Sequence, residues 1–167
     1  MFFAPFGGAW VALWSYRANG HWELHQLLLA ILVSTALLYL AYRRYQLHKP
    51  ALAAQPDTPE KRKADNMFHI INGGQWVAIL IVGNVLANIR LADWVLAAAI
   101  FIVGLHFIPL ARLFNNSAHY ITGCALMLVA VVYPMVAPGG AANPIGCLCA
   151  GMILWASAFR AVTIVQS

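Results

Sequence analysis

The sequence predicts an all-α integral membrane protein with six transmembrane helices, arranged as three tandem helical hairpins with pseudo-repeat symmetry. Three observations support this fold class: an apolar composition, long apolar runs separated by short polar turns, and a recurring sequence pattern. Of the 167 residues, 62% are hydrophobic and only 9% are charged, with a mean hydropathy of +0.74. Soluble domains carry roughly 25% charged residues. A chain this small could not bury so much apolar surface in water, so the bilayer is its expected solvent.

The apolar runs set the expected helices. We place them at residues 1–16, 25–42, 67–88, 94–111, 119–137 and 145–165. About 20 residues cross the hydrocarbon core, so the first run is short, and we expect its helix to tilt or to begin at the membrane surface. Within one transmembrane domain of residues 1–167, the hairpins are then 1–45, 67–112 and 119–165.

Residues 46–66 form the only extended polar segment, and three prolines, Pro50, Pro56 and Pro59, interrupt it. Thr58, Pro59 and Glu60 together are typical of a helix start: a hydroxyl cap, a proline in the first turn and an acid near the positive end of the helix dipole. We expect a short surface helix here that leads into the third span.

The basic residues predict the orientation. Six of the ten lie in or beside this loop: Arg43, Arg44, Lys49, Lys61, Arg62 and Lys63. Short loops rich in lysine and arginine stay in the cytoplasm, so the 46–66 loop should be cytoplasmic. Six spans then place both termini inside. If the first run does not span, only the N-terminus moves outside. This clustering also argues against nucleic acid as a partner, because no basic face of a soluble domain is present.

One pattern recurs along the chain. Met67-Phe68 and Gly73-Gly74-Gln75-Trp76-Val77-Ala78-Ile79 match Met1-Phe2 and Gly7-Gly8-Ala9-Trp10-Val11-Ala12-Leu13 at the same spacing, and His119-Tyr120-Ile121-Thr122-Gly123 echoes His69-Ile70-Ile71-Asn72-Gly73. Glycines lack side chains, so neighbouring helices are expected to approach closely at these points. The recurrence predicts the three hairpins, with a shared site at a repeat interface as one consequence.

The candidate binding residues lie in the cytoplasmic half: His106, His69, His119, Arg112, Arg160 and Asn72. Ionisable groups at membrane depth usually face a bundle interior or a cavity, and a positive cluster suits an anionic headgroup or a small anionic solute. His106 is the strongest candidate because it lies furthest into a span. Pro109 should kink or end that helix and leave backbone carbonyls unbonded near His106.

Other interpretations remain open at these positions. The histidines and arginines can instead anchor the helices at headgroup level. His69 and His106 can be read as a haem-binding pair, and His21 and His25, which flank Glu23, as a surface metal site. We expect neither cofactor nor metal. Cys124, Cys147 and Cys149 contain no C-x-x-C pair and are expected to pack as small residues at helix contacts.

The segment Gly104-Leu105-His106-Phe107-Ile108-Pro109-Leu110-Ala111-Arg112 resembles a motif of small bacterial multi-pass inner-membrane proteins. The three-hairpin plan is similar to that of the acid-resistance membrane proteins of the HdeD type. These resemblances imply a bacterial inner membrane, and they imply no catalytic residue.

Two functions follow as expectations. The first is a small transporter or channel with a cytoplasmic-side polar pocket around His106, with a homo-oligomer as one form of it. The second is a membrane accessory, stress or immunity protein that acts through a protein or lipid partner without transport. An intramembrane enzyme is disfavoured, because the chain shows neither a nucleophile beside a base nor a carboxylate pair.

Overall fold

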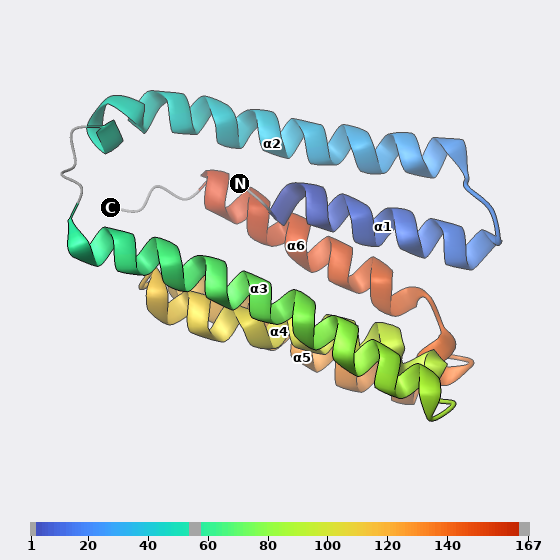
Figure 1. Ribbon diagram of the computed structural model, residues 1–167. Helices are drawn as coiled ribbons and strands as arrows, with labels where there is room; N and C mark the ends of the chain where they lie inside the picture. Colours follow the sequence, from blue (N-terminus) through green and yellow to red (C-terminus); the bar gives the residue numbers. More distant parts are fainter. Residues whose placement is uncertain (1–2, 54–57, 164–167) are drawn as a thin grey trace. The chain divides into compact units, whose positions relative to one another are not determined.

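The computed structural model describes residues 3–53 and 58–163, and within those ranges every regular element is helical (Figure 1). The six α-helices are α1 (Phe3–Asn19), α2 (Leu24–Ala53), α3 (Pro59–Asn88), α4 (Val95–Leu113), α5 (Ser117–Val136) and α6 (Ile145–Thr163). Two short 3-10 turns, η1 (Ala92–Trp94) and η2 (Gly140–Ala142), precede α4 and α6. The all-helical prediction is confirmed for the described residues.

The helices group into two compact units. The first joins α1 and α2 with almost all of α6, and the second contains α3, α4 and α5. In the first unit α1 packs on α2, and in the second α4 packs on both α3 and α5. The predicted third hairpin therefore has its two helices in different units, and the threefold plan remains a prediction.

In the first unit, glycines bring α1 close to α6. A Cβ built on Gly151 would lie 2.8 Å from the carbonyl oxygen of Gly7, so only the missing side chains permit this approach. The indole N–H of Trp155 donates to the carbonyl oxygen of Ala4 at 3.1 Å and to the hydroxyl of Ser34 at 3.2 Å. Trp155 thus links α6 to both helices of the first hairpin.

In the second unit, α4 and α5 make the equivalent close contact. A Cβ on Gly104 would lie 2.8 Å from the carbonyl oxygen of Gly123, and a Cβ on Gly123 would lie 2.7 Å from that of Gly104. Around this contact, Ile100 and Leu126 are completely buried and Phe107 is 2% exposed. The core of this unit therefore lies between α4 and α5, with α3 packed on the outside.

The polar segment 46–66 is more helical than predicted. α2 continues through Pro50 to Ala53, and α3 begins at Pro59 and runs without a break into the membrane-span sequence. The predicted cap is confirmed, because the Thr58 hydroxyl accepts a hydrogen bond from the Lys61 amide at 3.3 Å. Pro56 and residues 54–57 lie outside the described residues.

Within residues 3–53 and 58–163, five helices are long and apolar enough to cross a membrane: α2, α3, η1 together with α4, α5 and α6. α1 has 17 residues, about 26 Å at the helical rise, which is short of the roughly 30 Å hydrocarbon core. No residue of α3 is buried, and Trp76, Leu80 and Ile81 each expose more than half of their surface. Such an apolar surface suits lipid rather than water.

The two copies of the glycine pattern differ in their surroundings. Gly7 and Gly8 on α1 are buried against neighbouring helices, as expected. Gly73 and Gly74 on α3 have nothing within 4 Å of a Cβ built on either residue. The close approach expected from the second copy is therefore not made within its unit. Met1 and Phe2, the start of the first copy, lie outside the described residues.

Candidate functional site

The site is built around His106 on α4, seven residues before the end of the helix at Leu113. At the helical rise this places His106 about 10 Å into the span. Its Nδ1 lies 3.0 Å from the carbonyl oxygen of Val103. A carbonyl only accepts hydrogen bonds, so Nδ1 carries the proton, and Nε2 of the neutral ring presents a lone pair.

Nε2 of His106 is buried and has no hydrogen-bond partner in the structure. A buried polar atom left without a partner costs roughly 1–3 kcal/mol, so native proteins rarely retain one without a reason. An unprotonated Nε2 can accept from a proton donor: a water, a hydroxyl or amine of a solute, or hydronium. The local chemistry therefore defines a point in the bilayer that attracts a hydrogen-bond donor.

Of the two effects predicted for Pro109, a kink or the end of the helix, the second does not occur. The helix does not end there, and it continues to Leu113. A proline inside a helix cannot donate to the carbonyl four residues earlier, here Leu105, directly beside His106. The backbone next to the imidazole therefore keeps an acceptor that the helix itself does not use.

A chain of rings connects the three predicted histidines across the second unit. The His106 ring lies 4.9 Å from that of Phe107, and the Phe107 ring lies 5.9 Å from that of His119 on α5. His119 lies 6.4 Å from Phe114, which in turn lies 5.9 Å from Phe68 on α3.

The chain ends at His69, whose ring centroid lies 5.8 Å from that of Phe68. The structure thus gathers His69, His106 and His119 on one aromatic cluster, formed with Phe68, Phe107 and Phe114. We call these six residues the imidazole–phenyl cluster. The three phenylalanines were not among the residues predicted for the site. Their positions could have indicated them, because each phenylalanine lies within five residues of a predicted histidine.

The other predicted residues have separate surroundings. Asn72 donates from its side chain to the carbonyl oxygen of Phe68 at 2.8 Å, so its amide stays on its own helix. Arg112 lies in the last turn of α4 and is exposed. Arg160 lies on α6 in the first unit, so its membership of the pocket remains a prediction.

A separate pocket of about 280 Å³ lies in the first unit, between the start of α1, the later turns of α2 and the end of α6. It is lined by Phe3, Ala4, Leu37, Ala41, Arg44, Tyr45, Ala158, Ala161 and Val162. The Arg44 guanidinium donates to the carbonyl oxygens of Ala161 and Val162 at 3.1 and 2.7 Å. A cation is favourable at this end of α6, because the last carbonyls of a helix carry its negative pole. From the sequence, Arg44 was predicted only to contribute to the orientation in the membrane.

Among the described residues, no group of three or more histidines, cysteines, aspartates or glutamates could hold a metal ion. At His21, Glu23 and His25, the position of the surface-metal alternative, the two nearest side-chain atoms, His21 Nε2 and Glu23 Oε1, meet directly at 2.7 Å. Glu23 pairs with both histidines, at 2.7 Å from His21 and 3.4 Å from His25.

Comparisons with known proteins found no relative. No protein-family model matches the chain, and neither a curated protein nor a solved structure matches it.

Proposed function

We propose that this is a small multi-pass protein of a bacterial inner membrane that passes a small solute through a polar site at His106. The observation that carries the proposal is the buried Nε2 atom of His106, which has no hydrogen-bond partner. An ionisable side chain inside a membrane span is costly, and such residues usually belong to a substrate or proton pathway.

The surroundings of His106 narrow the solute. Phe114, which is 48% exposed, offers a flat apolar surface, while His119 and His69 provide further imidazoles on the same cluster. Imidazoles change charge between pH 5 and 8. A small solute that donates a hydrogen bond or carries a proton, such as a weak acid or dihydrogen phosphate, fits this chemistry. The exposed Arg112, at the end of α4, would attract an anion toward the cluster.

The proposal includes the topology: six spans in three hairpins, with the 46–66 loop and the imidazole–phenyl cluster toward the cytoplasm and a homo-oligomer as one form. The pairing of α1 with α2 and of α3 with α4 supports the first two hairpins. The concentration of basic residues beside the end of α2 and the start of α3 supports the orientation.

The test uses purified full-length protein in liposomes that contain a pH-sensitive dye. Inorganic phosphate at pH 6 is added outside, and acidification of the lumen is recorded. We expect uptake above protein-free liposomes, with loss of more than 90% in His106→Ala. The matched control is Asn84→Ala, because the Asn84 amide donates at 2.8 Å to Leu80 on its own helix and lies outside the cluster.

Uptake equal to that of protein-free liposomes, for phosphate and for acetate and formate tested in the same way, would reject the transport proposal. Uptake that survives in His106→Ala would reject the site. Circular dichroism and gel filtration of each variant confirm that the protein is folded before flux is compared.

The pocket beside Arg44 favours a second candidate function, that of an accessory protein that acts through a lipid partner. Its walls are mainly apolar and it carries one arginine, which matches an acyl chain with an anionic headgroup. Thermal unfolding in micelles with added phosphatidylglycerol or phosphatidylcholine tests this. Selective stabilisation by phosphatidylglycerol that is lost in Arg44→Gln and kept in Arg43→Gln would support it, and equal stabilisation by both lipids would reject it.

A further inference from the structure

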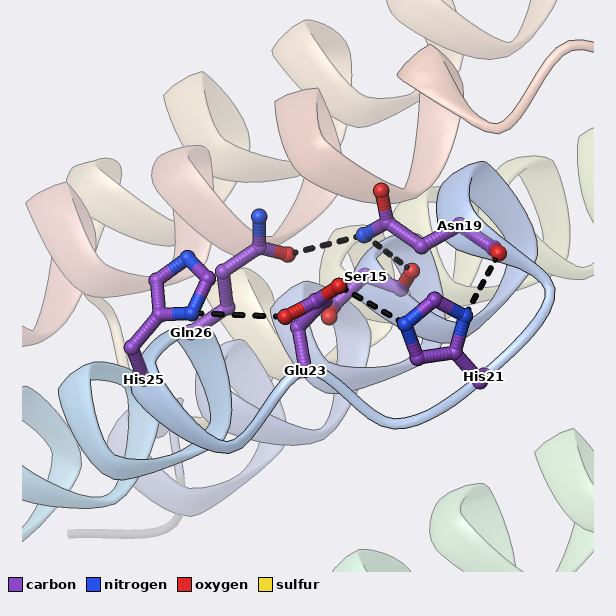
Figure 2. A network of polar contacts seen from close by, with 6 residues as sticks. All are labelled: Ser15, Asn19, His21, Glu23, His25 and Gln26. Atoms are coloured by element: carbon purple, nitrogen blue, oxygen red, sulfur yellow. Dashed lines mark hydrogen bonds and ion pairs between the residues drawn. The ribbon is translucent and has the colours of Figure 1, made fainter.

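The turn between α1 and α2 holds a network of polar side chains that the proposed function does not use (Figure 2). His21 lies at its centre. Nδ1 of His21 is 2.9 Å from the backbone carbonyl oxygen of Asn19, the last residue of α1. Nε2 of the same ring is 2.7 Å from Oε1 of Glu23, the residue before α2.

Both neighbours of the His21 ring are normally acceptors. The carbonyl of Asn19 has no proton, so Nδ1 must donate. A neutral imidazole has only one N–H, so its Nε2 would then turn a lone pair toward the carboxylate of Glu23. Two acceptors would repel each other at 2.7 Å. The contact is attractive only if the pair holds one further proton, on Nε2 of His21 or on Glu23.

The positions of the two residues also favour an extra proton on His21. His21 binds the last carbonyl of α1, where a helix carries its negative pole, and cations are stabilised there. Glu23 precedes the first turn of α2, where the positive pole stabilises a carboxylate. An imidazolium and a carboxylate in this order therefore complement both helix ends at once.

We propose that His21 and Glu23 form a proton-binding site, and that the bound proton stabilises the α1–α2 turn. With the proton bound, His21 donates to Asn19 and to Glu23 and bridges the two helices. When the proton leaves to water, the pair changes from neutral to a net charge of −1, and the bond from His21 to Glu23 is lost. If the proposed orientation holds, the site senses the compartment opposite the 46–66 loop.

Other contacts in the turn do not depend on this proton. The side-chain amide of Asn19 donates to the carbonyl oxygen of Ser15 at 3.0 Å and to Gln26 on α2 at 3.2 Å. The rings of Tyr16 and Trp22 pack with centroids 4.8 Å apart. The turn is therefore expected to remain formed when the proton leaves and the His21–Glu23 hydrogen bond is lost. The stability of the turn should change, and its fold should not.

One further titratable residue, His25, contacts the pair. Nδ1 of His25, in the first turn of α2, is 3.4 Å from the second carboxylate oxygen of Glu23. Among the described residues, His25 is therefore the alternative carrier of the proton beside Glu23.

The test is hydrogen exchange of the full-length protein in nanodiscs, followed over residues 19–27 at pH 5.5 and pH 8.0 and corrected for intrinsic rates. This range contains the amides of Gly20 and Leu27, which bond to Tyr16 and Glu23. We expect exchange about twofold to fivefold slower at pH 5.5, because an exposed ion pair contributes up to about a factor of five.

Glu23→Gln is the variant that best separates the pH effect from the hydrogen bond itself. Its side-chain amide can donate to the lone pair of neutral His21 and can accept from the imidazolium, so the bridge forms at both pH values and the pH effect should vanish with protection retained. In His21→Ala, the amides of residues 19–27 should exchange fast at both pH 5.5 and pH 8.0. His25→Ala should behave like the wild type.

Two results would overturn the proposal: equal protection of the wild type at both pH values, or a pH effect that survives in His21→Ala. Loss of the pH effect in His25→Ala would assign the proton to His25 and also reject the site as stated.

Discussion

The contact between α4 and α5 offers a direct test of the packing that holds the imidazole–phenyl cluster. In Gly104→Ala the new Cβ would lie 2.8 Å from the Gly123 carbonyl oxygen and 2.9 Å from the Met127 amide nitrogen, where ordinary contact begins at 3.4 Å. Both neighbours are backbone atoms, so no side-chain rotation relieves the clash. The helices must separate by about 0.6 Å, and overpacking of this kind typically costs 1–3 kcal/mol.

The matched control is Gly73→Ala on α3, where nothing lies within 4 Å of the added Cβ. Alanine is favoured over glycine in a helix by up to about 1 kcal/mol, so this variant should be unchanged or more stable. Denaturation of both variants in micelles, followed by circular dichroism, measures the difference. Because the helix preference applies to both positions, we expect Gly104→Ala to be less stable than Gly73→Ala by roughly 1–3 kcal/mol. Equal stability of the two variants would refute the close contact.

Three further predictions concern single contacts outside the cluster. Trp155→Phe removes the N–H that binds Ser34 and should lower the free energy of unfolding by about 1 kcal/mol, measured by the same denaturation. Arg90 adopts a φ of 63° after α3, so Arg90→Gly should raise the melting temperature, with a gain of about 0.5–1 kcal/mol; a lower melting temperature would contradict the assigned turn. Thr58→Ala removes the cap of α3 and should speed amide exchange in its first turn about fivefold, for a loss of about 1 kcal/mol, whereas unchanged exchange would show that the cap is not formed.

Composition and apolar runs were sufficient to predict an all-helical membrane protein, because a bilayer permits few alternatives for such a sequence. The position of the helix start at Thr58 was also predictable, since capping depends on local residues. The extension of α2 through Pro50 was not, because the rule that proline ends a helix is a local preference that the surrounding turns can override.

The site was predictable in part. His69, His106 and His119 were chosen because they lie in the cytoplasmic half of the spans, with His106 the deepest. The structure joins them through a chain of aromatic neighbours. The pairing depends on which helices pack, and sequence alone did not show that α4 and α5 meet at Gly104 and Gly123. The unequal surroundings of Gly73 and Gly7 have the same cause: a shared local sequence pattern does not determine which helix packs against it.

The central claim is that His106 lies at a water-accessible site entered from the cytoplasm, and a thiol-labelling measurement tests it most directly. His106→Cys and Leu105→Cys are made in a background in which the three native cysteines are replaced by alanine. Leu105 is 51% exposed and serves as the control for a position that is expected to face lipid. We predict that a charged methanethiosulfonate added to inverted membrane vesicles modifies His106→Cys and not Leu105→Cys, and that neither reacts in intact cells. Equal labelling of the two positions, or labelling of His106→Cys from outside intact cells only, would contradict the account.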